Sequence, residues 1–235
     1  MDYVKRIKEE LKERVEPGKA EILSRFFQAF PGGYGEGDEF IGVRVPEQRR
    51  VAKKYYRDIP LVEVEMLLQD KIHECRLTAL FILCYRFAKT CTEEEREKIV
   101  DLYLDNLDYV NNWDLVDASA EKILGPFLLE RDKKLLFQLA ESGYLWRQRA
   151  AIISTFYFIK QGRYKETLEL AKKYLTHEHD LIHKATGWML REIGKRDFQT
   201  LYSFLMEHSR QMPRTMLRYA IEKLDPALRQ KFMQK

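Results

Sequence analysis

The spacing of the helical segments constrains this sequence most strongly. Apolar residues recur at intervals of three and four along the chain, and the alternating apolar and polar runs typical of strands are nearly absent. Alternate helical segments are predicted to begin near residues 73, 111, 146, 180 and 213, at intervals of 38, 35, 34 and 33 residues. A helix pair that recurs at such a period is typical of an α-solenoid, because each pair needs its neighbours to bury its apolar face.

The sequence therefore predicts an all-α fold, an α-solenoid of HEAT- or armadillo-like antiparallel helix pairs with a concave basic face. An ordinary helical bundle is the alternative that periodicity leaves open. Residues 1–235 are long enough for one sizeable core, so we expect a single repeat domain. The helices are expected at residues 2–15, 18–30, 46–57, 60–69, 73–89, 92–106, 111–124, 131–142, 146–160, 163–175, 180–194, 197–209, 213–223 and 226–233.

Proline and glycine agree with this division. Five of the 11 glycines lie within residues 31–44, which predicts one long irregular connection and leaves a short hairpin there open. Thr92 followed by Glu95 indicates a capping box. Asp197 and Asp225 are expected N-caps. Six prolines stand where a helix is expected to begin, the position at which a missing N–H costs nothing: Pro17, Pro46, Pro60, Pro126, Pro213 and Pro226.

The composition excludes several classes of protein. Hydrophobic residues make up 45% of the chain and charged residues 33%, which excludes a disordered chain. No apolar run approaches the roughly 20 residues that a membrane span needs, and no apolar stretch follows the N-terminal charges as in a secretory signal. We therefore expect a cytoplasmic protein with no membrane partner. Its cysteines are expected to be reduced thiols: Cys75, Cys84 and Cys91.

The charge is unevenly distributed. The formal net charge is +4, but residues 184–235 carry 11 Lys and Arg against 5 Asp and Glu. Residues 1–183 carry 30 basic against 32 acidic residues. A basic C-terminal quarter on a near-neutral body indicates a polyanionic partner.

The alternate helices carry aromatic and charged residues on single faces. Trp113 and Asp117 are four residues apart in NNWDLVD and share a face. Arginines and a lysine on neighbouring helices could contact successive phosphates, and indole faces suit a cation or a sugar. A carboxylate among them could stabilise developing positive charge or orient a water. The corresponding residues of the following helices are Trp146, Arg147 and Arg149; Lys184, Trp188 and Arg191; and Arg214, Arg218 and Glu222.

Each of these residues also has a purely structural interpretation. A single tryptophan at helical spacing is more often part of the core than of a site. Asp117 could form an interhelical salt bridge with Arg149, and Arg214 and Arg218 could belong to a solvated face. The pattern over four helices is more informative than any one member.

Other kinds of site have little support in the sequence. The histidines of THEHDLIH lack a cysteine or a further histidine in register, so no metal site is expected at His177, His179 and His183. His73 and Glu74 lack the second histidine of H-E-x-x-H, and the glycine cluster matches no phosphate-binding loop. No cofactor is therefore expected.

Six stretches of the chain, taken in order, resemble one known family. They are FIGVRVPEQRR (40–50), HECRLTAL (73–80), NNWDLVD (111–117), LWRQRAAI (145–152), HKATGWMLRE (183–192) and MPRTMLRYAIE (212–222). They resemble the bacterial DNA alkylation repair family of HEAT-like solenoids, the AlkC/AlkD superfamily of alkylpurine DNA glycosylases. The resemblance covers nearly the whole chain.

The resemblance implies which residues form the site. In the AlkD branch two tryptophans and an aspartate meet the modified nucleotide, with an arginine nearby on the concave surface. Trp113 and Asp117 occupy the tryptophan and aspartate of W-D-x-V-D. Arg149 matches the arginine of W-x-x-R-A-A-I, and Trp188 matches the tryptophan of K-A-x-G-W-x-L-R-E. Such enzymes bind duplex DNA without a deep base pocket, and no metal or organic cofactor is implied.

Two functions and a more distant third follow as hypotheses. The first is a monofunctional glycosylase that releases cationic N3- or N7-alkylpurines from double-stranded DNA, acting as a monomer. Asp117 would stabilise the sugar cation, and Trp113 and Trp188 would hold the deoxyribose, with Arg149 beside them. Contacts with DNA phosphates are expected from Lys184, Arg191, Arg214, Arg218 and Arg147.

The second hypothesis is a non-catalytic binder of damaged, bent or branched DNA. A tyrosine near the N-terminus of the AlkD branch aligns with Phe26, which lacks the hydroxyl. The glycine-rich segment and the MPRTMLRYAIE stretch also look more like other branches of the family. The third hypothesis is a protein-binding scaffold, against which the basic C-terminal quarter argues.

Overall fold

The computed structural model describes residues 2–234, which form fourteen α-helices and no strand. The all-α prediction is confirmed. The chain divides into two compact units, Met1–Ile123 and Leu124–Lys235, with the division inside α7. The expectation of one domain stays a prediction, and each unit is described by itself.

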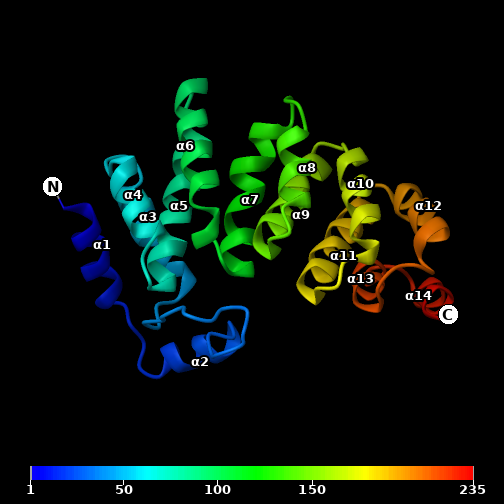
Figure 1. Cartoon of the computed structure of the whole chain (residues 1–235), viewed down its shortest axis with the longest axis horizontal. Coiled ribbons are helices and arrows are strands. Elements are labelled where there is room, and N and C mark those ends of the chain that lie inside the picture. Colours follow the sequence, from blue (N-terminus) through cyan, green and yellow to red (C-terminus); the bar gives the residue numbers. More distant parts are fainter. Residues whose placement is uncertain (1, 235) are drawn as a thin grey trace. The chain divides into compact units, whose positions relative to one another are not determined.

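The first unit contains the helices before α7 and most of α7 itself (Figure 1). They are α1 (Tyr3–Lys12), α2 (Lys19–Phe26), α3 (Val45–Tyr55), α4 (Leu61–Leu68), α5 (His73–Lys89), α6 (Glu93–Asp105) and α7 (Trp113–Leu128), with a 3-10 turn at Leu107–Tyr109. The second unit contains α8 (Lys134–Glu141), α9 (Leu145–Lys160), α10 (Lys165–Lys173), α11 (Asp180–Gly194), α12 (Phe198–His208), α13 (Arg214–Ala220) and α14 (Pro226–Met233), with a 3-10 turn at Tyr174–Thr176.

Both units have the layering of a helical repeat. In the second unit α9, α11 and α13 pack side by side in sequence order, while α8, α10 and α12 pack on α9 or α11 (Figure 1). In the first unit α3 packs on α5, and α1 and α4 pack against each other. The five helices predicted at the repeat period, α5, α7, α9, α11 and α13, begin within two residues of the expected positions. The predicted helical-repeat fold is confirmed.

The expected caps and most of the prolines lie where they were predicted. The side chains of Thr92, Asp197 and Asp225 each accept a hydrogen bond from a backbone N–H of the helix that follows. The prolines at the starts of α3, α4, α13 and α14 occupy the N-cap or the first two helical positions. None of the helices formed by residues 2–234 is long and apolar enough to cross a membrane.

Pro126 is the exception, because it lies inside α7 rather than at a helix start. The predicted end of this helix at residue 124 is therefore wrong. A proline within a helix loses one backbone hydrogen bond. Leu124 and Leu128 continue the buried apolar face of α7 past the proline. The helix continues for two residues past Pro126, so the packing of this apolar face outweighs the lost hydrogen bond.

The irregular segment after α2 is attached to the start of α5. The helix stops earlier than expected because Gln28 adopts a left-handed φ of 53°. Within residues 31–44 no hairpin forms. Instead, isolated bridges join Val43 to Val15 and Glu39 to Ile72. This segment therefore delivers its side chains to one end of α5.

Candidate functional site

The first turn of α5 buries polar side chains that need partners. Every residue from His73 to Cys84 is buried, including Glu74, Arg76 and Thr78. A buried charge is costly unless it is paired and hydrogen-bonded. Thr78 donates to the carbonyl of Glu74, and Arg76 donates to the carbonyls of Asp70 and Lys71. The other partners come from the irregular segment 31–44 and from the residues around the start of α7.

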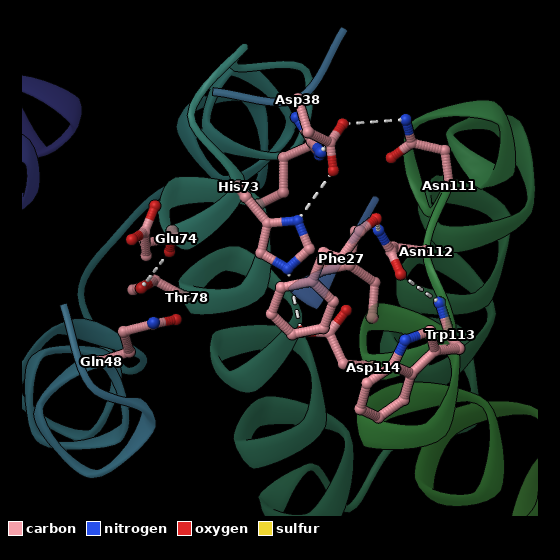
Figure 2. A network of polar contacts seen from close by, with 12 residues as sticks. Phe27, Asp38, Gln48, His73, Glu74, Thr78, Asn111, Asn112, Trp113 and Asp114 are labelled. Carbon is pink, nitrogen blue, oxygen red and sulfur yellow. Dashed lines mark hydrogen bonds and ion pairs between the residues drawn. The ribbon is translucent and has the colours of Figure 1, made fainter. Parts of the chain in front are cut away.

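His73 lies between two carboxylates (Figure 2). Its Nδ1 is 2.9 Å from Oδ2 of Asp38, and its Nε2 is 2.9 Å from Oδ2 of Asp114. Oδ1 of Asp38 lies 2.6 Å from Nη2 of Arg76 and accepts a hydrogen bond from Asn111 over 3.1 Å. The network joins the irregular segment, α5 and α7, so it fixes the start of α7 within the first unit.

The neighbouring charges and hydrogen bonds shift the pKa values of His73 and Asp38. Burial lowers the pKa of His73, but its hydrogen bonds to Asp114 and Asp38 outweigh burial and raise the pKa above 6.5. Burial raises the pKa of Asp38, but the bond from His73 and the charge of Arg76 bring it below 3.8. The raised pKa of His73 and the lowered pKa of Asp38 both favour a protonated imidazole held between carboxylates.

The raised pKa of His73 predicts a pH dependence of stability. A histidine whose pKa is raised by folding stabilises the protein fully below its unfolded pKa, near 6.5, and loses that contribution as pH rises through the folded value. We expect the difference in unfolding free energy between the wild type and His73→Gln to shrink as pH rises from about 6.5 into the alkaline range. Urea unfolding at each pH measures this difference. A difference that stays constant over that range would contradict a charged His73.

Glu74 organises the backbone beside this network. One of its carboxylate oxygens, Oε1, accepts hydrogen bonds from the N–H groups of Ile41, Gly42 and Val43 at 3.2, 2.8 and 3.2 Å. Gly42 has a φ of 90°, a conformation that favours glycine and turns consecutive N–H groups toward one acceptor. The FIGVRVP stretch is thereby positioned at the start of α5.

Trp113 begins α7 and packs on the end of α2. Its ring centroid is 5.8 Å from that of Phe26 and 5.3 Å from that of Phe27. Asn112, which is fully buried, accepts a hydrogen bond from the Trp113 N–H over 2.9 Å (Figure 2). The exposed Phe26 thus lies edge-on to the predicted site tryptophan. Asp117 follows one turn later on the same face of α7 and is half-buried.

Trp188 and Arg149 lie on neighbouring helices of the second unit. Trp188 is half-buried on α11, where its Nε1 donates to Glu192 over 3.3 Å and its ring lies 5.6 Å from Phe156. Arg149 on α9 is buried, and its Nη1 donates to the backbone carbonyl of Leu181 over 2.6 Å. This hydrogen bond joins α9 to the start of α11.

Gly187 explains part of the HKATGWMLRE stretch. A Cβ at this position would lie 2.4 Å from the Met216 carbonyl oxygen and 2.5 Å from Tyr219 Cβ. Only glycine allows α11 and α13 to approach this closely. Trp188 directly follows Gly187 on α11. The close packing of α11 on α13, which Gly187 allows, therefore sets the position of the helix that carries Trp188.

The five predicted phosphate contacts belong to the second unit and differ in their surroundings. Lys184 pairs with Asp180 over 2.7 Å, and Arg191 forms an ion pair with Glu222. Arg214 donates to the Met233 carbonyl over 3.0 Å and is exposed. Arg218 is exposed, and the guanidinium of Arg147 lies 5.2 Å from the ring centre of Tyr144.

The histidines near the start of α11 have structural partners. His179 accepts from the Leu181 N–H over 3.1 Å and caps α11. His177 Nε2 lies 2.9 Å from Gln148 Oε1, and His183 contacts the carbonyl of His177. Among residues 2–234, no three His, Cys, Asp or Glu side chains are grouped so as to hold a metal ion.

The predicted site residues thus fall into two groups. Trp113 and Asp117 lie one turn apart on α7 in the first unit, with Phe26 against Trp113, and Trp188 and Arg149 lie on adjacent helices of the second. Their union on a single basic surface stays a prediction. The buried network around His73 was not found from the sequence, although a histidine and an acid at the start of an otherwise apolar helix were its signal.

The fold and these residues define an α-helical repeat protein with an aromatic and acidic cluster at the start of one helix. The family model described as DNA alkylation repair enzyme matches residues 7–224. The chain belongs to this family, as the resemblance predicted, and its role is in DNA repair.

A solved structure supports the fold. The protein from Enterococcus faecalis described as a predicted DNA alkylation repair enzyme matches with a TM-score of 0.69 and 18% sequence identity. The match covers 91% of this chain and 98% of the other. No curated protein sequence matches the chain.

Proposed function

We propose that the protein is a monofunctional DNA glycosylase that hydrolyses the N-glycosidic bond of cationic N3- and N7-alkylpurines in duplex DNA. The observation that carries the proposal is the pairing of Trp113 and Asp117 one turn apart on α7, in a chain that belongs to the DNA alkylation repair family. Trp188 and Arg149 complete the proposed site from the second unit. No metal or cofactor is invoked.

The chemistry suits a substrate that already carries a positive charge. An alkylated purine is a good leaving group, because cleavage of its bond to C1′ releases it as a neutral base. The sugar left behind has oxocarbenium character, which the Asp117 carboxylate would stabilise while orienting the attacking water. The water adds to C1′ and passes its proton through the Asp117 carboxylate to the solvent, which leaves a hydroxyl on C1′ and the free neutral base. Indole faces at Trp113 and Trp188 would contact the cationic sugar.

DNA binding is assigned to the basic residues of the second unit. Lys184, Arg191, Arg214, Arg218 and Arg147 would contact phosphates, with Arg149 nearest the reacting nucleotide. The pairing of Lys184 and Arg191 with Asp180 and Glu222 supports a surface in which carboxylates hold the cations in place until phosphates replace them.

A non-catalytic DNA binder is the second candidate, and Phe26 is the observation that favours it. Phe26 lies against Trp113 at the position aligned with a tyrosine of the AlkD branch, so the site lacks that hydroxyl. This candidate would bind damaged, bent or branched DNA without releasing a base.

One assay separates the two candidates. Purified protein is incubated with methylated duplex DNA, and free 3-methyladenine and 7-methylguanine are measured by chromatography. We expect base release, together with DNA affinity that falls steeply as salt rises from about 50 to about 200 mM. Salt-sensitive binding without base release would instead identify a non-catalytic binder. Absence of binding at low salt would contradict both.

A further inference from the structure

Glu192 is a buried carboxylate on α11 to which the proposed chemistry gives no role. Its side chain is 8% exposed, and it lies one turn after Trp188 on the same face of the helix. Its Oε1 accepts a hydrogen bond from the indole Nε1 of Trp188 over 3.3 Å. The only polar atom of this indole is therefore directed at a carboxylate.

Cations of the same helix end hold this carboxylate. Lys195 donates to Oε1 over 2.5 Å, Arg196 donates to Oε2 over 3.1 Å, and Nε of Arg191 lies 4.0 Å from Oε1. Burial raises the pKa of Glu192, but the hydrogen bonds from Lys195 and Arg196 outweigh burial and bring the pKa below 4.5. The carboxylate is thus charged at neutral pH, and partners other than the indole fix its position.

Phe156 contacts the same indole from the neighbouring helix. Its ring on α9 lies 5.6 Å from that of Trp188, at an interplanar angle of 56°. This ring contact limits the tilt of the indole, while the hydrogen bond to Glu192 selects the direction of Nε1. An indole turned over about its last side-chain torsion would direct Nε1 away from Glu192 and lose that bond.

We propose that Glu192 is a positioning residue for Trp188, whose carboxylate holds the indole N–H and so fixes which face of the ring meets the sugar. The proposal rests on the proposed glycosylase function, in which Trp188 contacts the cationic sugar. A hydrogen bond to an anion also polarises the indole and leaves more electron density on its ring, which strengthens the attraction of the ring for a cation. Glu192 acts through Trp188 and is assigned no contact with the nucleotide.

The first test does not depend on catalysis. The chain has three tryptophans, so a ¹H–¹⁵N spectrum of the full chain contains three indole N–H resonances, and the one that Trp188→Phe removes belongs to Trp188. We expect Glu192→Leu to move this proton resonance upfield, because the indole loses a charged acceptor. The resonances of Trp113 and Trp146 are expected to stay in place. An unmoved Trp188 resonance would overturn the proposal.

Should Glu192→Leu fail to fold, Glu192→Gln replaces it in this test. Glutamine keeps the volume and one acceptor oxygen but removes the charge, and a hydrogen bond to a neutral acceptor is about half as strong. We expect a smaller upfield movement of the same resonance. A resonance unchanged in Glu192→Gln would then overturn the proposal.

The second test measures the consequence for the reaction. Glu192→Leu is expected to lower the single-turnover rate of 7-methylguanine release from methylated DNA by about tenfold. DNA affinity is expected not to fall, because the loss of a carboxylate leaves the nearby cations available to phosphates. Losses of rate and of affinity by the same factor would indicate a general structural defect and overturn the proposal.

A double-variant cycle separates positioning of the indole from a merely structural role. Phenylalanine at position 188 keeps an aromatic face but has no N–H, so Glu192→Leu is expected to change release by less than about twofold in Trp188→Phe. Losses that multiply fully in the double variant would overturn the proposal.

The matched control is Lys195→Met, which removes one ion pair of Glu192 but leaves Arg196 and the indole N–H on the carboxylate. Release by this variant is expected to stay within about twofold of the wild type. A tenfold loss in Lys195→Met would assign the effect to the ion pairs and overturn the role of the indole bond.

The two readouts distinguish failure of this proposal from failure of the proposed function. An upfield resonance together with wild-type release in Glu192→Leu would overturn the positioning role and leave the glycosylase intact. An upfield resonance in a protein whose wild type releases no base would overturn the glycosylase and support Glu192 as the group that holds the indole.

Discussion

Replacing Asp117 with asparagine is expected to lower the rate of 7-methylguanine and 3-methyladenine release by about 100-fold or more. The asparagine amide has nearly the shape of the carboxylate but carries no negative charge to oppose the developing sugar cation. DNA affinity is expected to change by less than about threefold, because the lost interaction forms mainly in the transition state. Single-turnover release from methylated DNA and equilibrium DNA binding measure the two effects separately.

The matched control for this variant is Glu121→Gln. Glu121 lies one turn beyond Asp117 on α7, is also half-buried, and loses the same charge on substitution. We expect Glu121→Gln to release bases at close to the wild-type rate. Undiminished release by Asp117→Asn would remove this carboxylate from the mechanism, and an equal loss in both variants would indicate a general effect of charge on α7.

Local patterns in the sequence were sufficient for most of the fold. Helix periodicity and caps depend on residues within one or two turns, and α5, α11 and α14 begin at the residues expected. Where prediction failed, tertiary packing decided. The apolar face of α7 continues to Leu128 and carries Pro126 into the helix, although proline alone favours a helix start.

The site was predictable only where its members share a helix. Trp113 and Asp117 are four residues apart, so their common face follows from helix geometry. Asp38, His73 and Asp114 are separated by 35 and 41 residues, and no local period connects them. Segment 31–44 was expected to be irregular. Its attachment to α5 depends on backbone N–H groups that donate to Glu74, and since every residue except proline has an N–H, the sequence did not indicate this attachment.

Arg149 illustrates a further limit of reasoning from one helix at a time. Helical spacing assigns a residue to one face of its own helix. It does not show which groups of the neighbouring helix lie opposite that face. The guanidinium of Arg149 donates to the Leu181 carbonyl, which belongs to α11. A positioning role toward α11 is therefore compatible with the predicted place of Arg149 near the nucleotide, because a planar guanidinium has five donors.

The largest expected loss of stability follows from replacing Asp38 with asparagine. Asp38 lies between Arg76 and His73, and the side chains of all three are less than 5% exposed. Removal of the carboxylate charge takes from Arg76 the carboxylate with which it pairs and leaves His73 with Asp114 alone, and the asparagine NH₂ group must face one of these donors. We expect the free energy of unfolding to fall by about 3 to 5 kcal/mol in urea at neutral pH.

Asp101→Asn provides the comparison for this change, because Asp101 is an exposed acid on α6 in the same unit. Its unfolding free energy is expected to lie within about 0.5 kcal/mol of the wild type. The loss in the double variant Asp38→Asn with His73→Gln is expected to differ from the sum of the two single losses, since the two side chains are hydrogen-bonded to each other. A loss below about 1 kcal/mol in Asp38→Asn would contradict a charged buried network, because a neutral hydrogen-bonded cluster loses only that much when one bond is weakened.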